Sequence, residues 1–215
     1  MKKIISLVLV SVMMLSLAAC GTQKPAETTA PAETTVPAET TLPVDTTAPA
    51  ATESAPSTVE SSLAILETIW GHYGEEEKFA VIGGNMESPV DGAPGNYDMA
   101  YAENLTYNLL VPAEQLAGID EAATMIHMMN ANTFTCGVVH LTEGTDAAAF
   151  AEAMRDAIQN NQWMCGFPET LTVAVLGGEY VLIAFGVNDA MNPFMTHFGE
   201  AFADANILFN EAIAG

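Results

Sequence analysis

Hydrophobic and polar positions change their spacing several times along the chain, and each change predicts an element. Apolar residues recur every three or four positions over residues 58–72, after a Ser57-to-Glu60 capping box, and again over residues 120–129. This spacing predicts amphipathic helices. A third helix, capped by Thr145, is predicted by a row of apolar residues four positions apart: Phe150, Met154 and Ile158.

Short apolar runs bounded by glycine and proline predict strands. The runs that fit this description are residues 78–82, 105–111 and 132–141. The clearest strand signal is a hairpin, in which residues 170–176 and 179–186 meet across Gly177 and Gly178. Two glycines supply the positive φ that a tight two-residue turn requires.

The chain is predicted to close with a helix capped by Asn192, with Pro193 at its first helical position. One side of this helix carries a row of aromatic residues: Phe194, Phe198, Phe202 and Phe209. Helices interleaved with an antiparallel hairpin predict an α+β domain over residues 57–215, with several helices packed on a small, mostly antiparallel sheet.

The N-terminus has a different pattern. Lys2 and Lys3 precede an apolar run that ends in small residues, which is typical of a secretory signal over residues 1–19. The sequence Leu-Ala-Ala-Cys at 17–20 resembles the lipobox of bacterial lipoproteins. That resemblance implies cleavage between Ala19 and Cys20, diacylglycerol on the Cys20 sulfur, and a lipid anchor on the outer face of the cell membrane. The alternative is a free Cys20 thiol behind an uncleaved signal.

Residues 20–56 repeat a Pro-Ala-Glu-Thr-Thr-like hexapeptide that starts at Pro25, Pro31, Pro37 and Pro43. Regular prolines, repelling carboxylates and little apolar surface predict a disordered linker. Its position between an anchor and a domain favours a spacer, and neutral low-complexity drift is the alternative.

The net negative charge of the mature chain limits the classes of partner that it is expected to bind. After removal of the signal, Lys24, Lys78 and Arg155 stand against 27 acidic residues, a formal charge of 3 − 27 = −24. Such a surface repels phosphate groups, so binding to nucleic acid is not expected. The membrane is therefore expected as a partner only through the lipid on Cys20.

The segments "MIHMMNANTFTCGVVHL" and "VLGGEYVLIAFGVNDAMNPFMTHFGEAF" together resemble a family of lipid-anchored extracytoplasmic proteins of Gram-positive bacteria that share a domain of unknown function. The resemblance covers about residues 105–204. It implies an extracytoplasmic location and supports the fold class, and it implies no catalytic residue.

The residues able to carry chemistry form no compact motif. The four histidines include no His-Glu-x-x-His pair, and His197 and Glu200 share a predicted helix face as either metal ligands or a hydrogen-bonded pair. Cys136 and Cys165 could form a disulfide or remain two separate thiols. The methionines fit core packing better than copper(I) binding. We therefore expect no metal, no cofactor and no catalytic residue.

These observations favour a non-enzymatic, lipid-anchored surface protein that binds an extracellular protein or peptide. Two alternatives stay open. One is an envelope enzyme or redox protein that uses Cys136, Cys165 or a histidine. The other is a small solute-binding lipoprotein that serves a transporter.

Overall fold

A computed structural model describes residues 59–129, 131 and 133–214, all within one compact unit of the chain. Its centre is a sheet of eight strands in the order β2-β1-β4-β5-β7-β6-β8, with β3 also paired to β4, and every pairing is antiparallel. The strands are β1 (Val81–Asn85), β2 (Ser88–Asp91), β3 (Gly95–Asn96), β4 (Ile119–His127), β5 (Phe134–Leu141), β6 (Thr170–Leu176), β7 (Tyr180–Gly186) and β8 (Asn206–Ala212).

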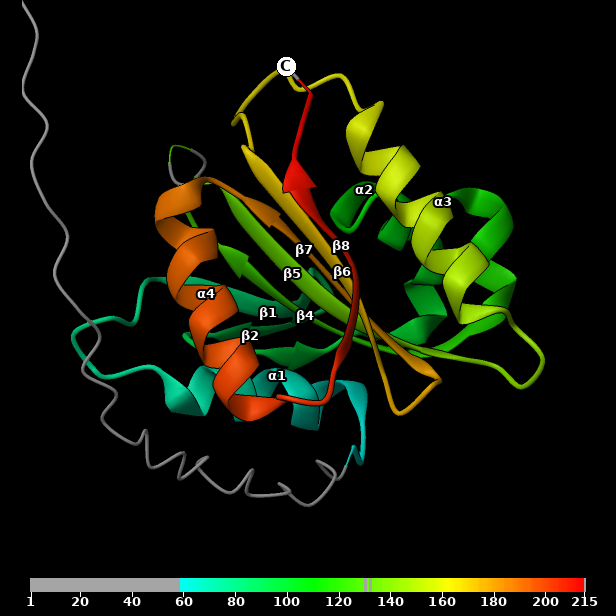
Figure 1. The fold of residues 1–215 in the computed structure, drawn as a ribbon, viewed down its shortest axis with the longest axis horizontal. Helices are drawn as coiled ribbons and strands as arrows, with labels where there is room; N and C mark the ends of the chain where they lie inside the picture. The colour runs from blue at the N-terminus through cyan, green and yellow to red at the C-terminus, as the bar shows by residue number, and fades with distance from the viewer. Residues whose placement is uncertain (1–58, 130, 132, 215) are drawn as a thin grey trace, which may run out of the picture. The chain divides into compact units, whose positions relative to one another are not determined.

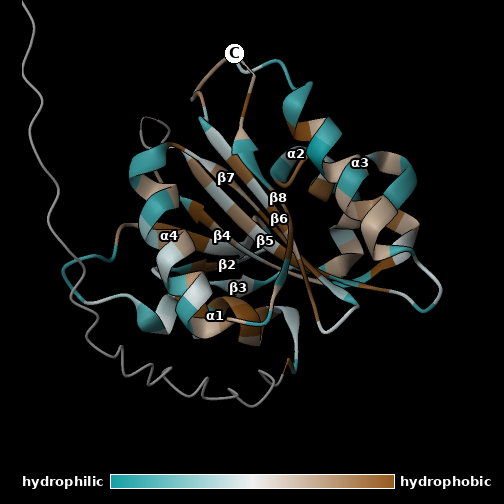
Figure 2. Cartoon of the chain, viewed as in Figure 1, coloured by the Kyte–Doolittle hydropathy of each residue, from teal (hydrophilic) through white to brown (hydrophobic). Residues whose placement is uncertain are grey.

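Helices cover both faces of this sheet (Figure 1). The α-helices are α1 (Ser62–His72), α2 (Leu105–Asn108), α3 (Ala147–Gln159) and α4 (Asn188–Ala201), and the 3₁₀ helices are η1 (Met99–Asn104) and η2 (Ala113–Gly118). One hydrophobic core lies between the sheet and α1 with α4, and the other lies between the sheet and α3 with α2. Figure 2 shows hydrophobic colour along the central strands. The predicted α+β class is confirmed.

Alternate residues of the central strands enter the two cores. On β5, Phe134, Cys136 and Val138 join the core under α1 and α4, whereas Val139 and Leu141 join the opposite one. The predicted strand and hairpin are confirmed here. In the hairpin, Gly177 and Gly178 take φ values of 59° and 87° between β6 and β7. The predicted α3 row of Phe150, Met154 and Ile158 is also buried.

The predicted helix over 120–129 is wrong, because this segment forms β4. Ala122, Ala123 and Met125 are all buried there, since helices cover the sheet on both sides. A strand buried on both faces shows a continuous apolar run instead of alternation. Such a run also satisfies helical spacing, so the two structures cannot be told apart by periodicity.

Two predicted strands also needed correction. The segment 105–111 forms the short helix α2 and a following turn, so the extended prediction is wrong. The strand predicted at 78–82 begins only at Val81, and it continues through Gly83 and Gly84 instead of ending there. A Cβ on Gly83 would lie 2.1 Å from the backbone nitrogen of Gly95, so glycine here allows two backbones to approach closely.

The helix starts were predicted less well than the helices themselves. The side chain of Ser61 caps α1 by accepting a hydrogen bond from the Ala64 N–H, and the predicted cap Ser57 lies outside the described residues. The cap of α3 is Asp146, one residue after the predicted Thr145. Both corrections shift the start of a helix and leave its buried face unchanged.

The closing helix is displaced and shortened. It begins at Asn188 instead of Asn192, so Pro193 lies inside it, and it ends at Ala201. Phe209 belongs instead to the edge strand β8, so its helical assignment is wrong. The spacing of the phenylalanines continues past Ala201 although the helix ends there. Phe209 lies on β8, a strand whose residues are mostly exposed or only partly buried.

Candidate functional site

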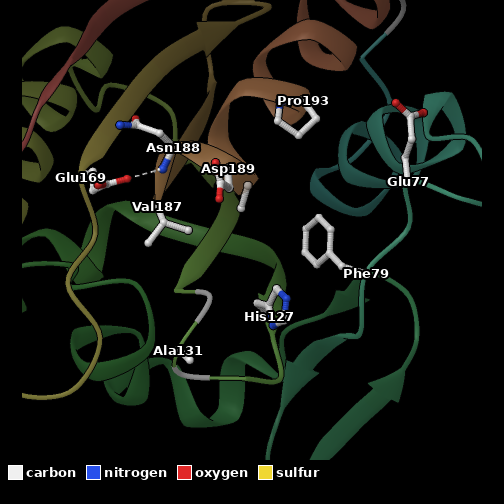
Figure 3. A pocket seen from close by; sticks show the side chains of 10 residues that line it. Glu77, Phe79, His127, Ala131, Glu169, Val187, Asn188, Asp189 and Pro193 are labelled. Carbon is white, nitrogen blue, oxygen red and sulfur yellow. Dashed lines mark hydrogen bonds between the residues drawn. The ribbon is translucent and has the colours of Figure 1, made fainter.

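A cleft of about 680 Å³ opens at the start of α4 (Figure 3). Binding sites for small molecules are commonly about 300–1,000 Å³, so the cleft could hold a ligand of that size. Its walls come from the loop before β1, the end of β4, the residue before β6 and the first turns of α4. They include Glu77, Phe79, His127, Glu169, Val187, Asn188, Asp189, Ala190 and Pro193.

Glu169 closes the N-terminus of α4. Val187, at the N-cap position, provides no side-chain hydrogen bond, and the Asn188 N–H donates instead to Glu169 Oε2 at 2.7 Å. The Thr170 hydroxyl donates to Asn188 Oδ1 at 2.6 Å, which fixes the same corner from the neighbouring strand. A carboxylate at this place is favourable, because the first amides of a helix carry partial positive charge. Glu169 therefore already fills the anion site of α4.

Asp189 adds a second carboxylate to this corner. It lies in the first turn of α4 and is exposed. Four residues later, Pro193 has no N–H to donate to the Asp189 carbonyl, so this carbonyl lacks the amide that it would meet in an uninterrupted helix. The start of α4 thus offers the cleft negative charge and a backbone acceptor together.

His127 and Phe79 form the floor between the acidic groups, as Figure 3 shows. Their rings stack with centroids 4.9 Å apart and planes 9° apart. The Met129 N–H donates to His127 Nδ1 at 3.0 Å, so the neutral ring carries its proton on Nε2. Burial lowers the pKa of His127 below its usual value. The floor is therefore an uncharged, flat surface at neutral pH.

The carboxylates of the cleft have no lysine or arginine partner in the part of the chain that the structure describes. The two candidates there are Lys78 and Arg155. Lys78 pairs with Glu75 at 2.7 Å, and Arg155 pairs with Glu211 at 2.5 Å. The negative charge of Glu169 and Asp189 is therefore balanced only by the helix dipole, equivalent to roughly half an elementary charge.

The predicted pair of His197 and Glu200 does share a face of α4, with Nδ1 and Oε2 3.1 Å apart. Glu77 lies 3.6 Å from His197 Nε2, and His72 lies 3.6 Å from Glu200. These contacts join α1, α4 and the loop between α1 and β1. Among residues 59–129, 131 and 133–214, no group of three or more His, Cys, Asp or Glu side chains is arranged to hold a metal ion.

The two domain cysteines stay apart. Cys136 is fully buried in β5, and burial raises the pKa of its thiol. Cys165 is exposed in the loop before β6, and both thiols are free. The structure therefore shows two separate thiols, which was one of the two alternatives, and no disulfide between Cys136 and Cys165.

The methionines divide into two groups. Met125, Met154 and Met191 are buried, in agreement with the core-packing interpretation. A second group is strongly exposed, contrary to that interpretation: Met86, Met128, Met129 and Met164. The exposed group needs another explanation.

The signal, the linker, Ala19 and the predicted lipidation site Cys20 all lie outside the described residues. None of the helices in the described part of the chain combines the length and hydrophobicity needed to cross a membrane. The chain matches no protein-family model, no curated protein and no solved structure. The family resemblance therefore stays a prediction.

Sequence reasoning missed the acidic cleft. It gave no functional role to Glu77, Phe79, Glu169 or Asp189. These residues are far apart in the chain and become neighbours only through the order of the strands. The available signal was weak: Glu169 and Asp189 flank the two ends of the hairpin, which antiparallel pairing brings together.

Proposed function

We propose that this chain is a lipid-anchored extracytoplasmic binding protein whose cleft at the start of α4 takes a cationic group. The observation that carries the proposal is the excess negative charge of that cleft, which the helix dipole offsets only in part. Glu77, Glu169 and Asp189 surround it, and the lysine and arginine of the described domain are engaged elsewhere. A ligand cation would supply the missing charge.

An anionic ligand fits this cleft poorly. Helix N-termini commonly bind phosphate or carboxylate through free amides. Here Asn188 already donates to Glu169, and the amides of Ala190 and Met191 donate to the Val187 carbonyl. A second anion would therefore find these amides occupied and three carboxylates nearby.

An ammonium or guanidinium group has suitable neighbours. The carboxylates accept its hydrogen bonds, and the Asp189 carbonyl provides a further acceptor. Apolar walls from Phe79, Val187 and Pro193 suit the methylene stem that carries such a group. The chemistry of the cleft thus corresponds to a lysine or arginine side chain, or to a small solute that bears an amine.

The anchored location rests on the sequence pattern at 1–20. Nonenzymatic binding is the favoured activity because the two domain thiols lie apart and Cys136 is inaccessible. A small cationic solute delivered to a transporter is the second candidate, since a cleft of about 680 Å³ is large enough to enclose one.

Binding of two probes that differ only by the terminal ammonium group, measured with the full chain, tests the proposal. N-acetyl-lysine methylamide should bind measurably by NMR titration, whereas N-acetyl-norleucine methylamide, which lacks the charge, should bind at least about fivefold more weakly. Asp189→Asn should remove most of that preference. Equal binding of the two probes would refute a cationic ligand.

The matched control is Glu143→Gln. Glu143 follows β5 at the end of the sheet opposite to the cleft, because Leu141 pairs with Ile119 and not with the His127 end of β4. This variant removes the same charge and should leave the preference for lysine unchanged. If both variants weaken binding equally, only the net charge matters and the cleft is not the site.

A further inference from the structure

Two smaller hollows continue from the cleft. The second hollow, of about 170 Å³, shares His127 with the cleft, and the third, of about 160 Å³, shares Asn108 and Ile126 with the second. Shared walls place the three side by side around the end of β4. A ligand that occupies all three must be elongated.

The third hollow is mainly apolar, the second is mixed, and exposed hydrophobic side chains gather at both. Of the nine large hydrophobic side chains that are exposed in the described residues, six line the two hollows or adjoin their lining residues. Met86, Tyr107 and Met129 line the hollows, and Val90, Met128 and Met164 are the chain neighbours of lining residues. Exposed hydrophobic side chains that cluster in one patch indicate an interaction site more often than single exposed ones do. Methionine also adapts its shape to different partners.

Two local features distinguish the second hollow. Leu110 has φ of 61°, the one positive φ among the described residues other than glycine, and such backbone strain gathers at binding sites. Trp163 lines the same hollow, and its indole N–H is buried without a hydrogen-bond acceptor in the described part of the chain.

We infer that the ligand is a peptide segment of another protein in which a lysine or arginine lies close to apolar residues. This inference rests on the proposed function, because the basic side chain occupies the acidic cleft. The apolar neighbours then fill the second and third hollows, and the extended backbone passes His127.

Electrostatic repulsion argues against two ligands that the protein itself could supply to the cleft, its own N-terminal segment and a second copy of the chain. The N-terminal segment 21–58 carries five acidic residues and only Lys24. A second copy would bring a domain with 22 acidic residues against Lys78 and Arg155. Both would be repelled by Glu169 and Asp189, so a basic foreign segment is the complementary partner.

Three peptides, titrated into the full chain by isothermal calorimetry, test the inference. The first is acetyl-Gly-Lys-Gly-Leu-Leu-Gly-amide, the second has glutamine in place of lysine, and the third has glycine in place of both leucines. The first should bind about tenfold more tightly than either of the others, because only it uses both parts of the site. It should also change the fluorescence of Trp163, since Trp70 lies buried in the opposite core.

The double variant Tyr107→Ala and Met129→Ala removes two exposed walls of the second hollow. It should weaken the first peptide about tenfold and leave the leucine-free peptide unchanged. Tyr101→Ala, which changes an exposed tyrosine outside all three hollows, should affect neither.

The outcomes separate the two proposals. If the first and the leucine-free peptides bind equally, the apolar extension is refuted while the cationic cleft stands. If the glutamine peptide binds as tightly as the first, the cationic cleft is refuted, and this inference falls with it.

Discussion

At the residue scale, an irregularity in one strand creates a charged contact. The pairing of β4 with β5 shifts between Ile119 and Glu121, so Asp120 has no partner in the ladder. Such a bulge redirects the side chain of the extra residue. Asp120 Oδ1 lies 2.5 Å from His140 Nδ1, and Glu179 lies 3.7 Å from the other ring nitrogen.

This contact makes the stability of the domain depend on pH. The hydrogen bond to Asp120 raises the pKa of His140, partly opposed by burial. A raised folded-state pKa contributes stability that is fully present below the unfolded value, about 6.5, and is lost as pH rises through the folded value. Asp120→Asn should therefore lower the free energy of unfolding more at pH 5.5 than at pH 8.5.

The expected loss at pH 5.5 is under about 1 kcal/mol, because Asp120 is half exposed and solvent screens the pair. Urea denaturation at both pH values measures it. Glu143→Gln, which removes a carboxylate without an ion-pair partner, provides the control. A loss of the same size at both pH values would show that His140 is not the titrating partner.

At the scale of elements, the crossing of β1 and β3 depends on glycine. A Cβ on Gly83 would lie 2.1 Å from Gly95 N and 2.4 Å from Pro94 C, both backbone atoms that cannot rotate away. We expect Gly83→Ala to lower the free energy of unfolding by at least about 2 kcal/mol, through overpacking. Denaturant titration monitored by circular dichroism measures this change.

Gly71 in α1 provides the opposite case. A Cβ there would meet nothing within 4 Å. Gly71→Ala should therefore raise the free energy of unfolding by up to about 1 kcal/mol, because alanine loses less backbone entropy in a helix. If Gly83→Ala proves as harmless as Gly71→Ala, the close approach of β1 and β3 is not a feature of the folded protein.

The same elements show how far the sequence could predict the fold. The hairpin of β6 and β7 was predicted because its glycine pair lies between two apolar runs of strand length. The buried row of α3 was predicted because charged residues such as Glu152, Arg155 and Asp156 lie off the row of apolar positions. β4 was missed because burial on both faces removes the alternation that identifies a strand. The crossing at Gly83 was missed because Gly83 and Gly84 are typical of a turn, and only the folded structure shows which backbone they approach.

At the scale of the whole molecule, charge and exposed apolar surface occur together at one end of the sheet. The cleft collects residues from 77–79, 127, 169 and 187–193, which no local pattern links. Under the proposed function, the excess of carboxylates over the domain would attract basic partners from a distance, and the hollows would then provide contact area. If the proposed binding holds, the acidic composition of the domain has a specific use in binding.

The anchor proposed at Cys20 would hold the chain where such partners occur. If Cys20 carries diacylglycerol, its sulfur provides the attachment, and two or more acyl chains together give stable anchoring. Cys20→Ser should abolish incorporation of labelled palmitate and release the protein from the membrane fraction or leave it as unprocessed precursor. Cys165→Ser removes the exposed thiol of the domain and should leave both properties unchanged. Lipid incorporation that survives Cys20→Ser, or that is lost with Cys165→Ser, would place the anchor elsewhere and separate the binding domain from the membrane location proposed for it.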